Sequence, residues 1–151
     1  MSDWHAFPDR ESLDQALAAC VISRLQQGIT ERGTAHLVVS GGSTPIQLFS
    51  ILADADVEWG RVVVLLADER WVQVDHEDSN ERLVRQTLLT GRAKSARFLS
   101  LLPSPDGEIT NISSLSTLLQ ALPRFDVVLL GMGEDGHTAS LFPCSTALRE
   151  G

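Results

Sequence analysis

The sequence predicts an α/β fold in which helices cover both faces of a parallel sheet. Short apolar runs alternate along the chain with segments of helical periodicity, as they do in β-α units. The apolar runs show no polar alternation, which is typical of strands that a parallel sheet buries on both faces. Stretches rich in glycine and polar residues follow three of the runs, at the strand ends where such folds bind ligands. Together these observations predict a Rossmann-like architecture.

The first helix is predicted over residues 12 to about 27, because apolar residues recur there on one helical face. Ser12 is a residue type that caps helix starts, and it is the predicted N-cap. Gly28 and Gly33 are expected to bracket the turn that follows. The apolar run Ala35–Val39 then predicts a short buried strand.

The second helix is predicted over Ile46–Ala53, with Thr44 as its N-cap and Pro45 at its first helical position. The strongly apolar run 61–67 predicts the second strand. A third helix is expected over residues 79–89. Asp78 is its preferred N-cap, because a glutamate follows three positions later, as in a capping box.

The last third of the chain predicts three more elements. Residues 97–99 form a short apolar run that predicts a strand, and residues 112–122 are apolar enough for another helix. The run 125–130 predicts the last strand. A glycine-rich loop follows it directly, and Pro143 limits any helix after this loop to a short one.

The composition predicts a single globular domain over residues 1–151. A net charge of −8 argues against nucleic acid or an anionic membrane as a partner, although a few amides and one arginine can still bind an anionic small molecule. Cys20 and Cys144 form neither a disulfide framework nor a metal-ligand cluster, so free thiols are expected. Without a signal peptide or an apolar run of membrane-spanning length, a cytoplasmic location is expected.

Gly131, Gly133 and Gly136 spell G-x-G-x-x-G after the last strand, which is the spacing of a dinucleotide-binding loop. That fingerprint usually follows the first strand of its unit and needs an acidic residue about 20 positions later. Here the loop comes late in the chain, and Glu134 and Asp135 within it would repel a pyrophosphate. A nicotinamide or flavin cofactor is therefore not expected.

Asp135 and His137 stand together in this loop, at a predicted helix start. A carboxylate two positions away can orient an imidazole and fix its tautomer. A neutral imidazole near pH 7 is a suitable general base for activating water. His137 is therefore a candidate catalytic base, and an ordinary surface or core histidine is the alternative.

The stretch SGGSTP, residues 40–45, follows the first strand. Its glycines let the backbone approach a ligand, and Ser40, Ser43 and Thr44 add hydroxyl groups. The N–H groups and the dipole of the next helix favour an anion there. The stretch lacks the Gly-Lys-Ser/Thr of a Walker loop and the G-x-S-x-G of a nucleophile elbow. It predicts an anion-binding loop, with a plain capped turn as the alternative.

Asp68, Glu69 and Arg70 place two carboxylates and a guanidinium at the end of the second strand. A surface salt bridge is the alternative to a functional role. The neighbouring Trp71 is expected in the core, with a pocket wall as the alternative. Residues 75–78, with the sequence DHED, suggest a metal site, but no second histidine lies at ligand spacing, so none is predicted.

Taken in order, SGGSTP, DERWVQVDHEDSN and LLGMGEDGHTASLFP resemble the motifs of the 6-phosphogluconolactonase family, which belongs with the glucosamine-6-phosphate isomerases and deaminases. The match spans most of the chain, and the third motif is highly specific. The resemblance implies hydrolysis of 6-phosphoglucono-δ-lactone to 6-phosphogluconate, the second step of the oxidative pentose phosphate pathway. It implies a sugar phosphate lactone as the small-molecule partner, with no metal and no cofactor. The oligomeric state stays open.

The resemblance also implies roles for individual residues. His137 would activate water against the lactone carbonyl, and Asp135 would orient His137. Arg70 would hold the lactone and steady its developing negative charge, while Asp68 would contact sugar hydroxyls or position Arg70. Backbone amides near Gly133 would form the oxyanion site. The remaining candidates are the phosphate-binding residues Ser40, Gly41, Gly42, Ser43 and Thr44, and Asn80 as a hydrogen-bonding residue near the pocket.

Two other functions stay open. The deaminase branch shares the phosphate loop and D-G-H, but it typically has tyrosine in place of Arg70 and glutamate in place of Phe142, so both residues favour the lactonase. The other alternative is a sugar-phosphate-binding protein without activity, or an inactive fragment. Family members continue well past residue 151 with further strands, helices and basic residues. The chain is therefore expected to lack the family's C-terminal part and to leave one sheet edge open.

Overall fold

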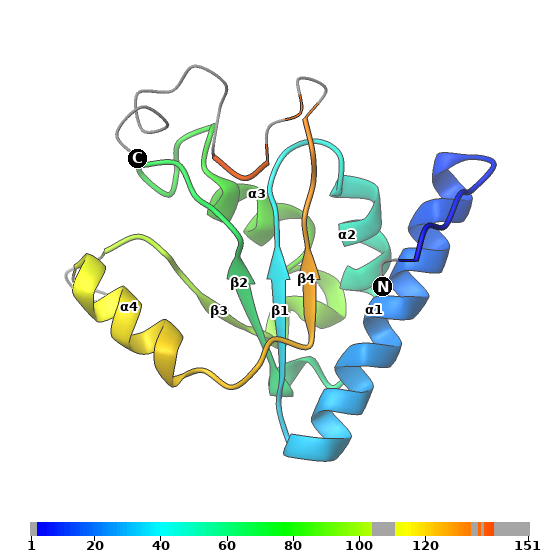
Figure 1. The fold of residues 1–151 in the computed structure, drawn as a ribbon, viewed down its shortest axis with the longest axis horizontal. Helices are drawn as coiled ribbons and strands as arrows, with labels where there is room; N and C mark the ends of the chain where they lie inside the picture. The colour runs from blue at the N-terminus through cyan, green and yellow to red at the C-terminus, as the bar shows by residue number, and fades with distance from the viewer. Residues whose placement is uncertain (1–2, 104–110, 134–135, 137, 141–151) are drawn as a thin grey trace.

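The computed structural model describes residues 3–103, 111–133, 136 and 138–140. At the centre of the protein is a four-stranded parallel sheet in the order β3-β2-β1-β4 (Figure 1). The predicted α/β class and the parallel sheet are confirmed. Two strands match their predictions residue for residue, and the other two lie inside longer predicted runs. The strands are β1 (Ala35–Val39), β2 (Val62–Leu66), β3 (Arg97–Leu99) and β4 (Val127–Leu129).

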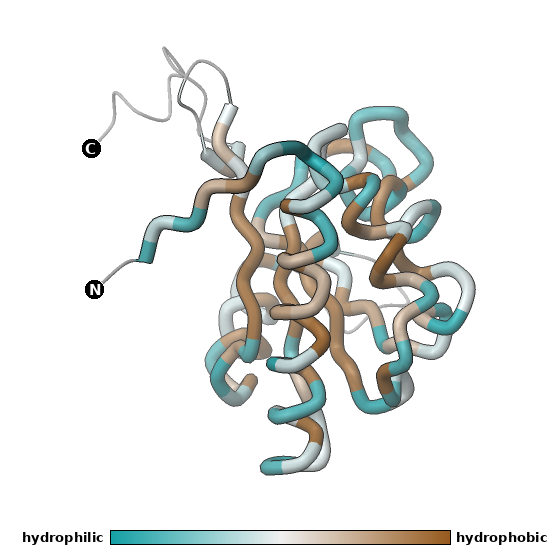
Figure 2. The backbone as a smooth tube through the Cα atoms, turned by 90° about the vertical axis from the view of Figure 1, so that its right-hand side faces the viewer, coloured by the Kyte–Doolittle hydropathy of each residue, from teal (hydrophilic) through white to brown (hydrophobic). Residues whose placement is uncertain are grey.

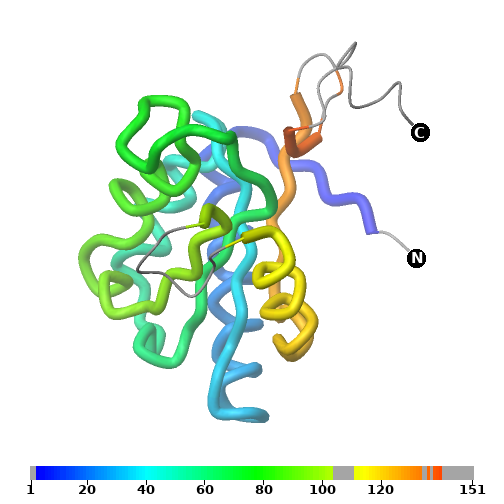
Figure 3. Tube along the Cα trace, turned by 90° about the vertical axis from the view of Figure 1, so that its left-hand side faces the viewer, coloured from blue at the N-terminus to red at the C-terminus, as the bar shows by residue number. Residues whose placement is uncertain are grey.

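Helices cover both faces of the sheet, as predicted (Figure 1, Figure 3). Three helices pack on one face: α1 (Arg10–Arg32), α2 (Ile46–Ala53) and α3 (Asn80–Thr87). The helix α4 (Ile112–Ala121) packs on the other. Two 3₁₀ helices lead into β2 and β3, namely η1 (Trp59–Arg61) and η2 (Gly91–Ser95).

The core lies on both sides of the sheet because successive strand residues point to opposite faces. In β1, Leu37 and Val39 belong to the large core beneath α1, α2 and α3, whereas Val38 belongs to a smaller core beneath α4. The sheet region of the chain is mostly brown in Figure 2, which marks its apolar character. This burial on two faces explains why the strands appear in the sequence as continuous apolar runs.

Two further features bear on the class of protein. Within the described residues, no helix is both long and apolar enough to cross a membrane. Cys20 on α1 is an exposed free thiol, as predicted, while Cys144 lies outside the described residues.

The helix α1 extends beyond its predicted bounds at both ends. Asp9, and not Ser12, is the N-cap: its carboxylate accepts the Ser12 N–H at 2.7 Å, and this hydrogen bond lowers the pKa of Asp9. The predicted turn at Gly28 was wrong, since Gly28 lies inside the helix. A Cβ there would lie 2.6 Å from a carboxylate oxygen of Asp126, so the glycine permits close approach of the segment before β4. The helix ends at Gly33, whose φ of 80° is left-handed.

The bounds of α2 match the prediction, but the prediction of Thr44 as its cap was wrong. Pro45 occupies the N-cap position, and no side chain caps the helix. The Pro45 carbonyl accepts the Phe49 N–H at 2.8 Å. The Thr44 carbonyl instead accepts a hydrogen bond from the Arg10 guanidinium, so this turn is held by α1.

The strand order reverses at β1, which has β2 on one side and β4 on the other. The connection from β1 to β2 runs through α2 on one face, and the connection from β3 to β4 runs through α4 on the opposite face. The two crossover connections therefore lie on opposite faces of the sheet. Open α/β sheets bind ligands at such a switch point, beyond the carboxyl ends of the strands.

His36 of β1 is expected to make stability depend on pH. It is buried, and its Nδ1 atom has no hydrogen-bond partner among the described residues. Burial lowers the pKa of His36 below its ordinary 6.5, and the Arg32 guanidinium acts in the same direction against the attraction of Asp126. Below about pH 6.5 the unfolded chain therefore binds a proton that the folded chain excludes. The free energy of unfolding should fall with decreasing pH, by at most about 1.4 kcal/mol per pH unit from this group.

The measurement is urea unfolding of the wild type and His36→Gln from about pH 8 to about pH 5. The variant should lose most of the decline in unfolding free energy below about pH 6.5. His5→Gln, which changes an exposed histidine, should keep that decline. An unchanged pH dependence in His36→Gln would contradict the role given to His36.

Candidate active site

A pocket of about 370 Å³ lies at the carboxyl ends of β1, β2 and β4. The loops that follow these three strands contribute to it, and the first turns of α1 close one side. The fold thus brings together the three motif stretches that the sequence placed at strand ends. The lining residues are Arg10, Leu13, Asp14, Leu17, Ser40, Gly41, Gly42, Ser43, Thr44, Pro45, Leu48, Asp68, Arg70, Asn80, Leu129, Leu130, Gly131, Met132, Gly133 and Ala139.

The loop 40–45 is tied to its neighbours on both sides. The amide and the hydroxyl of Ser40 both donate to the Leu129 carbonyl at the end of β4, each at 3.1 Å. On the other side, the Arg10 guanidinium donates to the Thr44 carbonyl. Between these ties, the glycines and hydroxyl side chains of the loop line the pocket.

Arg10 brings a positive charge to this loop, and the sequence analysis did not find it. Its Nε atom donates at 3.0 Å to the carboxylate of Asp14, whose side chain is 2% exposed. This contact fixes the guanidinium while its Nη2 atom donates to Thr44. Arg10 lies on a different element, 34 positions before Thr44. No local pattern in the sequence connects the two residues.

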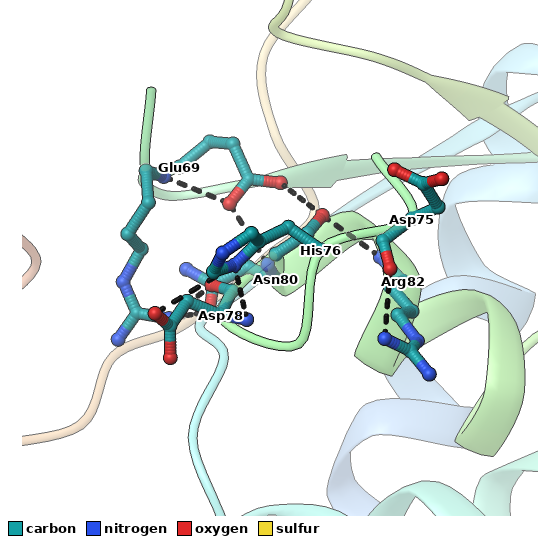
Figure 4. A network of polar contacts seen from close by, with 8 residues as sticks. Glu69, Asp75, His76, Asp78, Asn80 and Arg82 are labelled. Atoms are coloured by element: carbon teal, nitrogen blue, oxygen red, sulfur yellow. Dashed lines mark hydrogen bonds and ion pairs between the residues drawn. The ribbon is translucent and has the colours of Figure 1, made fainter. Parts of the chain in front are cut away.

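Glu69 caps α3 from the loop that connects β2 to this helix. Its carboxylate accepts the Asn80 N–H at 2.8 Å and the Ser79 hydroxyl at 3.2 Å (Figure 4). It also accepts the Glu81 N–H at 2.8 Å. Ser79 is the N-cap, and its hydroxyl accepts the N–H three residues later, so the preference for Asp78 was wrong. Glu69 therefore satisfies helix N–H groups that a capping box was expected to serve.

Arg70 lines the pocket, and its guanidinium is held by groups at the start of α3. Its Nη1 atom donates to Asn80 Oδ1 and to the Asp78 carbonyl, both at 2.8 Å. The Asn80 Nδ2 atom donates to the Asp68 carbonyl at 3.0 Å. Asn80, itself only 2% exposed, thus links the backbone of Asp68 to the side chain of Arg70.

Asp68 is also joined to the third motif, because its carboxylate accepts a hydrogen bond from the Ser140 hydroxyl. Nearby, the Thr138 hydroxyl donates to the Gly131 carbonyl at 3.2 Å. Ala139, between these two contacts, has a φ of 51°. A non-glycine residue in this left-handed region costs on the order of 1–3 kcal/mol, and such residues cluster at functional sites.

The loop after β4 contributes Gly131 and Gly133 to the pocket lining. Gly136 has a φ of 83°, and its N–H donates to the Gly133 carbonyl at 2.9 Å. The predicted orienting residue Asp135 and the predicted base His137 lie outside the described residues. Their roles stay predictions.

The remaining candidates of the second motif do not line the pocket. Trp71 is 76% exposed, so its predicted place in the core was wrong. In the acidic segment, His76 Nδ1 accepts the Asp78 N–H at 3.1 Å, and both residues are exposed. Across the part of the chain that the structure describes, no three His, Cys, Asp or Glu side chains gather as a metal ion would require.

Comparison with known proteins gives the family of this chain. The family model described as glucosamine-6-phosphate isomerases/6-phosphogluconolactonase matches residues 8–151. The chain belongs to this family. The resemblance drawn from the three motifs is thereby confirmed.

Named relatives within the family agree with this membership. A 6-phosphogluconolactonase from Mesorhizobium japonicum is 47% identical over 149 residues, which is 98% of this chain and 63% of the relative. One from Pseudomonas putida is 44% identical over 147 residues, covering 97% and 61% respectively. The crystal structure of a 6-phosphogluconolactonase from Shewanella baltica matches with a TM-score of 0.85 and 47% identity, over 95% of this chain and 62% of that one. The chain spans a little under two thirds of the length of these three proteins.

Proposed function

We propose that this protein hydrolyses 6-phosphoglucono-δ-lactone to 6-phosphogluconate. Relatives and a similar structure that bear the name 6-phosphogluconolactonase support the proposal. The observation that carries it is the single pocket shared by the loop 40–45, Arg70 and the loop after β4. A sugar phosphate lactone carries an anion and an electrophilic carbonyl. The pocket offers loop amides and hydroxyls for the anion and a guanidinium for the carbonyl.

In this proposal the phosphate binds the loop 40–45. The backbone of Gly41 and Gly42 approaches it closely, and the hydroxyls of Ser43 and Thr44 add donors. The guanidinium of Arg10 lies beside the same loop. This local positive charge allows an anion to bind although the chain as a whole carries a charge of −8.

The proposed chemistry needs one water molecule and no metal or cofactor. The oxygen of the water bonds to the lactone carbonyl carbon while His137 accepts a proton from that water. Asp135 keeps the imidazole of His137 in the productive tautomer. The carbonyl oxygen becomes an oxyanion, which Arg70 and N–H groups near Gly133 stabilise. The bond from the carbonyl carbon to the ring oxygen then breaks, and the ring oxygen takes the proton from His137.

Asp68 supports the proposed site in two ways. Its carbonyl accepts from Asn80, which holds Arg70. Its carboxylate accepts from Ser140, in the same loop as His137. Its other carboxylate oxygen can accept a sugar hydroxyl.

The test is the rate of lactone hydrolysis by the 151-residue chain above the spontaneous rate. Lactone made in situ and a coupled readout of 6-phosphogluconate suffice. The wild type should turn over, and His137→Ala should lose about 10²- to 10⁴-fold in kcat, the range typical of a general base. His5→Ala, which removes an exposed histidine, should keep the wild-type rate. Full activity in His137→Ala would overturn the assignment of the base.

Two other outcomes identify the alternatives. Ammonia release from glucosamine 6-phosphate by the same chain would indicate a deaminase. Binding of 6-phosphogluconate by a folded chain that shows no turnover would indicate a sugar-phosphate-binding protein.

A further inference from the structure

Among the described residues, Glu69 is not one that lines the pocket, yet its carboxylate contacts residues that do. One oxygen accepts the N–H groups of Arg70 and Asn80, each at 2.8 Å. The other oxygen accepts the Glu81 N–H at 2.8 Å and the Ser79 hydroxyl at 3.2 Å. The dashed contacts of Figure 4 show this carboxylate bridging its own loop and the start of α3. A carboxylate with four donors is fixed in place, and it fixes those donors in turn.

These constraints meet at the side chain of Asn80. It is 2% exposed, so its amide depends on protein partners rather than on water. Oδ1 accepts from Arg70, and Nδ2 donates to the Asp68 carbonyl. The same amide fills the space beside Gly41, where a Cβ would lie only 1.9 Å from Oδ1. Asn80 therefore packs against the loop after β1 while it holds the loop after β2.

We propose that Glu69 is a positioning residue for Arg70 and that it acts through Asn80. The inference rests on the role of Arg70 in the proposed function. An arginine side chain has many rotamers, so the guanidinium needs fixed partners to stay directed into the pocket. Glu69 anchors the backbone of Asn80 and of Arg70 itself, so the distance and direction between Oδ1 and the guanidinium stay constant. Its negative charge at the start of α3 also suits the helix dipole.

Glutamine at position 69 keeps the size of the side chain but replaces one accepting oxygen with an NH₂ group. That group cannot accept a hydrogen bond, so about half of the donors lose their partner. We expect Glu69→Gln to lower kcat for lactone hydrolysis about 10- to 100-fold, because small displacements of a catalytic group have effects of this size. KM should change by less than about threefold, since the substitution alters no residue of the phosphate loop itself. Glu77→Gln, the same change at an exposed carboxylate of the same loop, should leave both constants unchanged.

A double-mutant cycle separates positioning from a general loss of stability. In an Arg70→Ala background, assayed at raised enzyme concentration, Glu69→Gln should lower kcat by less than about twofold. An equal loss in both backgrounds would overturn the proposal, and so would wild-type kcat in Glu69→Gln.

Gly41→Ala approaches the same side chain from the opposite side. The added methyl group must displace the Asn80 amide, so we expect the kcat loss of Glu69→Gln without any change at residue 69. Gly60→Ala is the matched control, because a Cβ at Gly60 meets nothing within 4 Å. Wild-type kcat in Gly41→Ala would contradict the role of Asn80.

A readout without substrate keeps this inference separate from the proposed function. The ¹⁵N order parameter of the Arg70 Nε–H group reports how firmly the guanidinium is held. It should fall in Glu69→Gln and stay constant in Glu77→Gln, whether or not the chain turns over lactone. An unchanged order parameter in Glu69→Gln overturns the positioning role, whereas absent turnover in the wild type counts only against the proposed function.

Discussion

Arg70→Ala is expected to lower kcat/KM for lactone hydrolysis about 10²- to 10³-fold, which is the loss seen when one oxyanion-stabilising donor is removed. Arg70 lines the pocket, and two contacts at 2.8 Å hold the Nη1 atom of its guanidinium. Alanine removes both the charge and the planar donor group. Steady-state kinetics on the folded variant measure the effect, with the thermal midpoint as a check on folding.

Two comparison variants sharpen this expectation. Arg70→Lys keeps the positive charge but loses the planar fork, so its activity should fall between those of the wild type and Arg70→Ala. Arg82→Ala removes a guanidinium whose Nη1 atom donates to the Asp75 carbonyl, outside the pocket lining. It should keep kcat/KM within about twofold. Equal activity in Arg70→Ala and Arg82→Ala would remove Arg70 from the proposed chemistry.

Phe49→Ala is expected to lower the free energy of unfolding by about 3–5 kcal/mol. Phe49 on α2 is completely buried in the core shared by α1, α2 and α3. The substitution removes apolar contacts and leaves a cavity that the surrounding helices can only partly fill. Because domains of this size have a total stability of about 5–15 kcal/mol, much of the variant should unfold on mild heating.

Urea unfolding monitored by circular dichroism measures this loss. Ile46→Ala on the same helix is the matched control, because Ile46 is 37% exposed. Its loss should stay below about 1 kcal/mol. Similar losses in both variants would mean that burial in this core is not what stabilises α2.

The strands could be predicted because the property that defines them is local. Ala35–Val39 is apolar except for His36, and all five residues are buried. A parallel sheet with two covered faces leaves that pattern in the sequence whatever lies around it. The order of the strands could not be predicted in the same way. It depends on contacts between segments far apart in the sequence, since β1 pairs with β2 on one side and with β4 on the other.

The helix ends were predicted less well, because distant residues decide them. Gly28 looked like a helix breaker, but the close approach of Asp126 requires a glycine inside α1. Asp78 looked like the better cap for α3, because a glutamate follows it at capping-box spacing. The Glu69 carboxylate accepts the first N–H groups of this helix instead, and no local pattern in the sequence indicates that contact. In both cases a tertiary contact decided the outcome over the local propensity.

For the candidate site, the motif positions were predictable and the supporting contacts were not. The loop 40–45 and Arg70 stand at strand ends, where the fold class alone directs attention. Arg10 and Glu69 act through contacts that carry no spacing signal: one reaches the Thr44 carbonyl from α1, and the other reaches α3 from its neighbouring loop. Trp71 was assigned to the core because it is a large aromatic residue, but it lies in an exposed loop.

The pairing of β1 with β4 also determines when the pocket can form during synthesis. Leu37 pairs with Val127, more than half the chain later, whereas Ala35 pairs with Val62. Closing the longer loop costs more entropy, so β4 is expected to join the sheet after β1 and β2 have paired. Until then the edge of β1 is open to other strands. Ser40, which follows β1, also has no contact with Leu129 before β4 joins. The β4 side of the candidate pocket is thus expected to form only after β1 and β2 have paired, when β4 covers the open edge of β1.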